Sequence, residues 1–143
     1  MKKILFILIA ALPFMLSCKM EPSDNGDLDG FWHLERVDTL STSGSLDLSQ
    51  AKLFWAFQKD LLQLRGDEQE FYLRFNHHDD QLDLSNPHLR DREKDDPAIS
   101  SSTMYLIRPY GINEEEEYFQ VINLDNDNMV LRNQDLQLWF RKF

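Results

Sequence analysis

The sequence predicts an all-β protein, a small antiparallel up-and-down barrel of about eight strands with one long loop. From Leu28 onward, apolar and polar residues alternate with period two, a pattern typical of strands with one buried face. Polar segments that suit turns separate these runs, with no clearly amphipathic helix between them. Because a sheet of this size removes its exposed edges by closing on itself, we expect a barrel.

The segment 51–64 has two interpretations. Phe54, Phe57 and Leu61 stand at helical spacing. Against a helix, Trp55 and Phe57 alternate with smaller or polar neighbours, and aromatic residues are enriched in sheets. We favour two strands joined by a tight turn, and the helix remains the alternative.

The clearest strand covers residues 70–77, in which Phe71, Leu73 and Phe75 alternate with polar residues. Polar residues follow as a hairpin turn, and a second alternating strand comes after them. Residues 86–103 carry two prolines and a dense mixture of charges, which predicts a long excursion from the sheet. Loops of that length are uncommon unless they have a function or stay mobile.

The C-terminal end predicts a meander of three strands. Phe119 and Val121 alternate with polar residues, and 125–128 supplies a turn. Residues 129–132 form the next strand, and the last strand is expected around Leu138.

The N-terminus has the features of a bacterial lipoprotein export signal. Two lysines precede an apolar stretch, and the segment ends at Cys18, the only cysteine, in a sequence that resembles a lipobox. We therefore expect residues 1–17 to be removed and Cys18 to be lipidated. Because a lone cysteine cannot form an internal disulfide, the fold must depend on its apolar core.

Residues 18–27 have the composition of a flexible tether, which leaves 28–143 as the barrel domain. Lys19 follows the cysteine in place of the aspartate associated with inner-membrane retention in some bacteria. The acidic residues after it resemble the export signals of Bacteroides-type surface lipoproteins. We expect a protein anchored by lipid in the outer membrane, on its periplasmic or surface-exposed face.

The charge of the chain excludes some partners. With 25 acidic and 15 basic residues, the net charge is −10. Nucleic acid is bound through clustered Lys and Arg, and here the basic residues are scattered among acids. An acidic surface also disfavours anionic lipid, so membrane contact is expected through the lipid at Cys18 alone.

Two short motifs resemble the lipocalin family. The first expected strand opens with Gly30-Phe31-Trp32, which is similar to the Gly-x-Trp motif of lipocalins. Arg141 resembles the basic residue that packs over that tryptophan in the family. The resemblance implies that Gly30, Trp32 and Arg141 close one end of the barrel as structural residues.

A wider resemblance covers most of residues 28–143. It is to a family of lipocalin-like lipoproteins from Bacteroides-type bacteria that has no established activity. The other motifs of true lipocalins are not visible in this sequence. The stretches that carry the resemblance are 108–112, 119–124, 129–132 and 138–142.

Two hypotheses for function follow. In the first, implied by the lipocalin resemblance, the barrel interior binds a small apolar ligand. In the second, the interior is packed and the outer surface binds a protein or glycan of the envelope, with Phe54, Tyr72, Val130 and Trp139 facing outward. The residues expected to line an interior site are Trp32, Leu34, Trp55, Phe57, Phe71, Leu73, Phe75 and Leu138.

The sequence offers no catalytic constellation. Ser100–Ser102 lack the glycines of a nucleophile elbow. His77 and His78 invite a metal hypothesis, but adjacent strand residues point to opposite faces, which favours a solvated hairpin tip. The run Glu114–Glu117 lacks the ligand spacing of a calcium loop and is expected to be solvated. We expect no enzyme activity, no metal and no cofactor.

Overall fold

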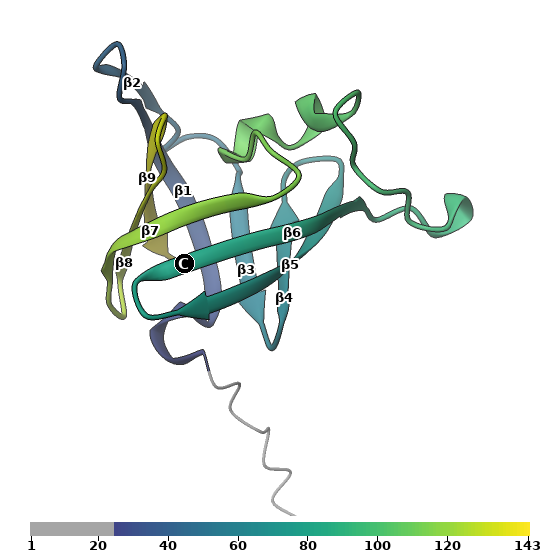
Figure 1. Cartoon of the computed structure of the whole chain (residues 1–143), viewed down its shortest axis with the longest axis horizontal. Coiled ribbons are helices and arrows are strands. Elements are labelled where there is room, and N and C mark those ends of the chain that lie inside the picture. Colours follow the sequence, from purple (N-terminus) through teal and green to yellow (C-terminus); the bar gives the residue numbers. More distant parts are fainter. Residues whose placement is uncertain (1–24) are drawn as a thin grey trace, which may run out of the picture.

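The structure, a computed structural model, describes residues 25–143. The expected signal peptide 1–17, Cys18 and most of the expected tether lie outside the described residues. Within 25–143 the chain forms nine strands and four short 3-10 helices (Figure 1). They are η1 (Gly26–Leu28), β1 (Gly30–Thr39), β2 (Gly44–Asp47), β3 (Phe54–Gln58), β4 (Leu61–Arg65), β5 (Glu70–His78), β6 (Gln81–Leu89), η2 (Arg92–Lys94), η3 (Met104–Leu106), η4 (Arg108–Tyr110), β7 (Glu117–Leu124), β8 (Asn128–Arg132) and β9 (Leu136–Lys142).

The strands form one antiparallel sheet that closes into a barrel. Its order is β2-β1-β3-β4-β5-β6-β7-β8-β9, and β9 pairs back with β1. Eight strands follow one another up and down around the barrel, which confirms the predicted fold class. The extra strand β2 was not predicted. It pairs with the second half of β1, Arg36–Thr39, and all four of its residues are exposed.

The ambiguous segment 51–64 forms strands, as favoured. β3 and β4 pair in register from Phe54↔Arg65 to Gln58↔Leu61. Lys59 in the turn has φ of 57°, and Asp79 in the β5–β6 turn has φ of 51°. Such left-handed residues allow a short reversal between strands. The expected strand over 70–77 and the C-terminal meander are also confirmed.

The inward side chains fill the barrel. Trp55 is fully buried, and its ring centroid lies 4.8 Å from that of Phe140 and 6.1 Å from that of Phe119. The rings of Phe57 and Phe75 meet edge to face at 5.0 Å. Side chains from all around the barrel thus contact one another across its axis, as expected for a close-packed interior.

The lower end of the barrel, where η1 lies in Figure 1, is closed by the chain that precedes β1. Leu28 is fully buried, and the Trp32 indole N–H donates to the Leu28 carbonyl at 2.9 Å. Asn25 donates to the Lys59 carbonyl at 2.7 Å, and the Asp27 carbonyl accepts from the side chain of a C-terminal lysine. The last residues of the expected tether therefore contact the barrel.

The cation over Trp32 is Lys142, which corrects the expectation for Arg141. Lys142 Nζ lies 4.9 Å from the centroid of the Trp32 ring. In the β1–β9 register Trp32 faces Lys142, whereas Arg141 is opposite His33 and exposed. Alternation from the buried Phe140 explains the difference, since residues one apart in a strand point to opposite faces.

Gly30 allows this close approach. A Cβ at Gly30 would lie 3.0 Å from Lys142 Cε, closer than ordinary van der Waals contact. Gly30 has φ of 124°, which side-chain-bearing residues rarely adopt. Gly30, Trp32 and Lys142 therefore close the lower end together.

Replacing Lys142 by alanine is expected to destabilise the barrel more than replacing Arg141 by alanine. The Lys142 change removes a cation–π contact of about 0.5–2 kcal/mol, and with it the hydrogen bond to Asp27 O at 3.1 Å. The exposed Arg141 should contribute within about 0.5 kcal/mol. Urea unfolding of both variants measures the difference, and a larger loss for Arg141→Ala would contradict this assignment.

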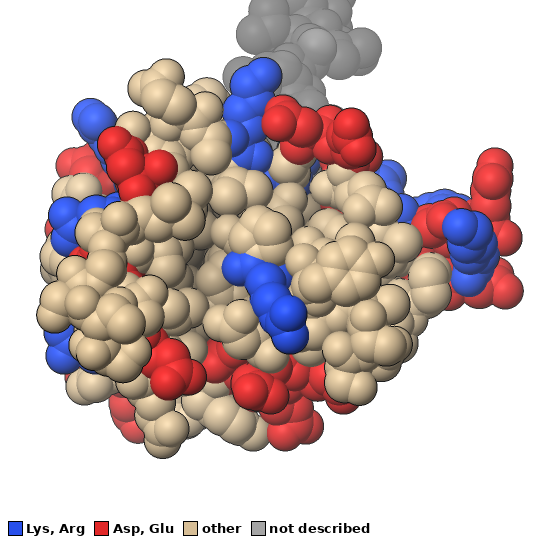
Figure 2. All heavy atoms as spheres, turned by 90° about the horizontal axis from the view of Figure 1, so that it is seen from above, with Lys and Arg blue, Asp and Glu red and all other residues tan. Residues whose placement is uncertain are grey.

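The upper end is covered by a lid, which we define as residues 99–112. Within it η3 and η4 lie over the barrel mouth (Figure 1), and Met104, Ile107 and Tyr110 are buried. The Trp55 indole N–H donates to the Tyr110 carbonyl at 3.2 Å. Figure 2 looks onto this end and shows mostly uncharged residues across it.

The long excursion predicted at 86–103 begins later and extends further. β6 continues to Leu89, and the connection runs from Arg90 to Glu116. Its first part, which we call the excursion loop (residues 90–98), projects from the barrel side, and its second part is the lid. In residues 25–143 no helix is long and apolar enough to span a membrane.

Candidate functional site

The residues expected to line an interior ligand site form the packed core. All eight are buried, with exposed fractions from 0% for Trp32 to 9% for Phe75, and all belong to one contact cluster. Among the eight, Phe71 is the one that also reaches a hollow on the outer wall, across β3, β4 and β5. A ligand inside the barrel would have to displace these side chains, whereas a ligand on the outer wall would not.

A groove lies on the outer wall across β3, β4 and β5. Strand register places Ala56 beside Gln63, and Gln63 beside Tyr72, with all three side chains pointing away from the core. Because the side chain of Ala56 is only a methyl group, the outer wall is hollowed at this position. The hollow has a volume of about 580 Å³, within the range of small-molecule sites. Its lining is Ala56, Gln58, Lys59, Asp60, Leu61, Gln63, Phe71, Tyr72, Arg90, Arg92 and Asp96.

The excursion loop supplies one wall of this groove. Leu89 N–H donates to Pro97 O at 2.9 Å, which joins the loop back to β6. Asp96 accepts the Asp91 N–H through Oδ1 at 2.7 Å, and donates its own N–H to Asp91 O at 2.9 Å. Asp95 and Asp96 both have positive φ, a conformation that aspartate tolerates better than most residues. The wall is thus held by its own hydrogen bonds.

Tyr72 connects the groove floor to this wall. Its hydroxyl donates to Asp96 Oδ2 at 3.3 Å, and its ring stacks on His88 with centroids 5.3 Å apart and planes 5° apart. Burial raises the pKa of the Tyr72 phenol, and the nearby charge of Asp96 raises it further. The phenol therefore stays protonated and can act as a hydrogen-bond donor.

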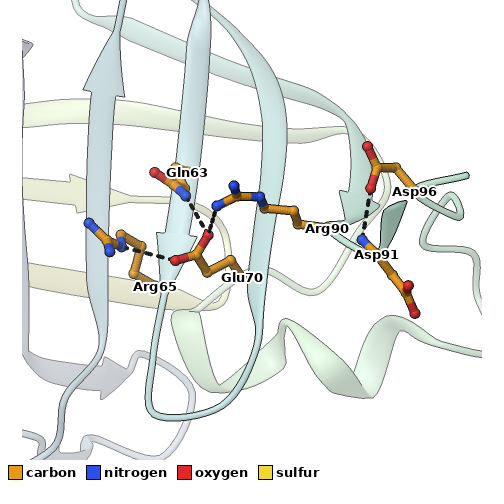
Figure 3. Close-up of polar contacts among 6 residues, drawn as sticks. All are labelled: Gln63, Arg65, Glu70, Arg90, Asp91 and Asp96. Atoms are coloured by element: carbon orange, nitrogen blue, oxygen red, sulfur yellow. Dashed lines mark hydrogen bonds and ion pairs between the residues drawn. The ribbon is translucent and has the colours of Figure 1, made fainter. Parts of the chain in front are cut away.

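An ion-pair cluster around Glu70 fixes the side of the groove where β4 ends and β5 begins (Figure 3). The Glu70 carboxylate accepts from Gln63 Nε2 at 2.9 Å, pairs with Arg65 Nε at 3.4 Å and accepts from Arg90. The Arg90 hydrogen bond holds the pKa of Glu70 below its usual range. The contacts with Glu70 thus hold the side chains of Arg90 and Gln63 in fixed orientations at the edge of the groove.

Two cations in the groove remain without an ion-pair partner among residues 25–143. They are Lys59, in the β3–β4 turn, and Arg92, in η2 of the excursion loop. The groove's acids are engaged, since Asp60 pairs with Arg74 at 2.5 Å and Asp96 accepts the two hydrogen bonds described above. The groove therefore presents positive charge on an acidic protein.

The histidines and serines that were candidates for a metal or catalytic site lie at a hairpin tip and at the start of the lid, respectively. His78 Nε2 lies 3.0 Å from Asp83 Oδ2 at the β5–β6 hairpin tip, while His77 is half-buried on the other face. Across residues 25–143, no three His, Cys, Asp or Glu side chains gather closely enough to hold a metal ion. Ser100–Ser102 are exposed at the start of the lid.

Glu117 is buried, which corrects the expectation that the whole run Glu114–Glu117 is solvated. It is 7% exposed, and its carboxylate accepts from Asn113 N at 3.1 Å and from Asn133 Nδ2 at 2.9 Å. It therefore joins the residue that follows the lid to the β8–β9 turn. Glu114, Glu115 and Glu116 are exposed, as expected.

Burial raises the pKa of Glu117 above its ordinary value of 4.5, and the hydrogen bonds from Asn113 and Asn133 oppose the shift. A raised carboxyl pKa gives stability that is fully present below 4.5 and is lost as pH rises through the folded-state value. The stability of the native protein relative to Glu117→Gln should therefore fall over that range. Urea unfolding between about pH 4 and pH 8 measures it. Glu114→Gln is the control, and parallel profiles for native and Glu117→Gln proteins would contradict the shift.

The four residues expected to face outward do so with different exposures. Phe54 stacks on Phe31 with centroids 4.7 Å apart and is half-buried. Trp139 donates to Asp38 Oδ2 at 2.8 Å and is half-buried. Val130 pairs with Trp139 and is only 7% exposed, so it offers little free surface. Of the four, Tyr72 is the one that lines the groove.

Comparisons with known proteins bear on the fold. A family model described as lipocalin-like domain matches residues 12–143. A lipocalin-like protein from Bacteroides uniformis matches with a TM-score of 0.61 and 21% identity, over 82% of this chain and 100% of that chain. An uncharacterized protein from Bacteroides eggerthii matches with a TM-score of 0.53 and 20% identity, over 80% and 98%. No curated protein matches the sequence. At these identities the two structures support the barrel fold.

Proposed function

Since the chain belongs to the lipocalin-like domain family, we propose that it is a cell-envelope lipoprotein whose packed barrel is a scaffold for binding at the outer wall. One observation carries this proposal. The eight side chains expected to line an interior site pack on one another, while the groove outside offers about 580 Å³. The geometry thus favours the surface-binding hypothesis over an apolar ligand inside the barrel.

The proposed anchor is a lipid at Cys18 in the outer membrane. The described chain begins at the lower end of the barrel, opposite the lid (Figure 1). A tether that leaves from there would keep the groove, on the side of the barrel, free for a partner. The family fold and the groove support a binding role rather than catalysis.

Labelled palmitate tests the anchor. The full chain expressed in a Bacteroides host should incorporate the label and partition with outer membranes, while Cys18→Ser should do neither. Protease treatment of intact cells then distinguishes the two faces, because a periplasmic domain survives in cells and is cut in lysate. Labelling that persists in Cys18→Ser would contradict the proposed anchor.

Native mass spectrometry of protein purified from its own envelope tests the site of binding. We expect no apolar molecule to remain bound, and no fluorescence gain with the uncharged dye N-phenyl-1-naphthylamine at neutral pH. A co-purifying apolar molecule that also remains bound to Ala56→Trp, in which the outer groove is filled, would instead favour the interior site. An envelope partner should be captured by the native barrel and by Ile122→Trp, which adds bulk elsewhere on the wall. Ala56→Trp, which fills the groove, should lose that partner.

A further inference from the structure

The charge of the groove points to an anionic ligand. Lys59 and Arg92 reach the same hollow from different elements, a strand turn and the excursion loop, and neither is neutralised among the described residues. Arg90 adds a guanidinium that Glu70 holds in place. On a chain with a net charge of −10, this local excess of cations favours a negative group bound between them.

The remaining side chains of the groove suit a hydroxylated ligand. Gln58 and Gln63 each offer an amide that donates and accepts hydrogen bonds. Sugar hydroxyls do both as well, so a mixed set of donors and acceptors matches them. Leu61, the Ala56 methyl group and the half-buried ring of Tyr72 give an apolar floor on which the C–H face of a sugar ring can pack.

The same geometry disfavours an acidic peptide. The groove crosses β3, β4 and β5 in the middle of the sheet, where each strand is paired on both sides. A peptide that adds to a sheet needs a free strand edge for its backbone hydrogen bonds. Among the groove residues only Leu61 and Phe71 are aliphatic or phenyl side chains large enough to anchor a peptide side chain, and Phe71 is 2% exposed.

We infer that this groove binds an anionic saccharide, a sugar chain whose carboxylate or sulfate groups lie between Lys59 and Arg92. The inference rests on the proposed function and names the ligand class of that surface. Arginine pairs with either anion through two parallel hydrogen bonds, so both are compatible with the site.

Calorimetric titration of the full chain, prepared without its lipid, tests the inference. The probes are a galacturonate oligosaccharide, a sulfated heparin-derived oligosaccharide, a neutral cello-oligosaccharide and a glutamate peptide. At least one anionic sugar should bind about tenfold more tightly than the neutral sugar, and binding should weaken as salt is raised. The galacturonate and heparin arms show which anion the site prefers. Tighter binding of the peptide, or equal binding of the neutral sugar, would overturn the inference.

Charge-matched variants locate the site. Lys59→Gln with Arg92→Gln should reduce affinity by about tenfold or more. Lys52→Gln with Arg108→Gln makes the same change in net charge at exposed positions outside the groove, and should change affinity by less than about twofold. All four residues are exposed, and thermal unfolding checks that both variants fold. Equal losses in the two variants would overturn the inference.

The two proposals can fail separately. If the native barrel captures an envelope partner that Ala56→Trp loses, while no anionic sugar binds, the saccharide is wrong and the outer-wall function stands. If purified protein instead retains an apolar molecule inside the barrel, the proposed function fails. Titration with the anionic sugars should change the chemical shifts of the side-chain amides of Gln58 and Gln63. These shifts detect binding in the groove independently of binding inside the barrel.

Discussion

Replacement of Trp55 by alanine is expected to lower the free energy of unfolding by about 3–5 kcal/mol. Trp55 is fully buried at the centre of the barrel, where its ring contacts Phe57, Phe119 and Phe140. Its indole N–H also bonds the Tyr110 carbonyl of the lid, so the change leaves both a cavity and an unpaired acceptor. This loss is a large part of the 5–15 kcal/mol by which a domain is typically stable.

Urea unfolding followed by circular dichroism measures the loss. Trp55→Phe keeps an aromatic ring in place and removes the hydrogen bond, so it should cost less than Trp55→Ala. Trp139→Ala removes a half-buried tryptophan from the outer wall and is the control for size. A loss below about 1 kcal/mol for Trp55→Ala would mean that the interior is loosely packed, and would reopen the interior ligand site.

The strands could be predicted because their signal is local. Alternation of Phe71, Leu73 and Phe75 with polar residues sets one buried face within a single strand, and the same rule identified the two strands in 51–64. β2 carries no such signal, since all of Gly44–Asp47 are exposed and neither face packs on the core. It forms because β1 is longer than its partner β3 and leaves backbone groups free.

The lid was missed for a related reason. Ile107, Tyr110 and Ile112 are buried, yet they lie in 3-10 turns whose spacing has no sustained period. Their burial comes from contact with the barrel mouth, which no pattern within the segment reveals. The long loop itself could be predicted from its prolines and charges, whereas its role as a cover could not.

The candidate site depends on register. Ala56, Gln63 and Tyr72 are far apart in sequence and meet only because three strands pair in one particular alignment. Arg92 joins them through the fold of the excursion loop. The sequence did single out Tyr72 as an outward aromatic residue. The small Ala56 between Trp55 and Phe57 was the remaining signal for a low point in the wall.

The choice between a filled and a hollow barrel could not be made from composition. The same inward residues, such as Phe57 and Phe75, would line a cavity or fill it, depending on the rings opposite them.

The exact position along the last strand decides which cation lies over Trp32. A shift of one residue from Arg141 to Lys142 moves the cation from the outer surface to the ring of Trp32.

Gly111→Ala is expected to lower the free energy of unfolding by about 2–5 kcal/mol, although it adds only a methyl group. Gly111 ends η4 with φ of 87°, a left-handed conformation that costs a side-chain-bearing residue about 1–2 kcal/mol. A Cβ there would also lie 2.7 Å from Leu138 Cδ2 and 2.8 Å from Cδ1. Because Leu138 is fully buried, it has little room to move, and overpacking adds about 1–3 kcal/mol.

Two further variants separate the backbone cost from the contact with Leu138. Gly26→Ala introduces the same methyl group at φ of 59° with nothing within 4 Å, so urea unfolding should report the backbone cost alone. Gly111→Ala combined with Leu138→Ala should lose less than the sum of the two single changes, since the second removes the clash. Strict additivity would mean that the lid moves away from the barrel to accommodate Cβ. Amide exchange in 104–112 would then rise in Gly111→Ala, and the lid would be a cover that can open rather than a fixed part of the core.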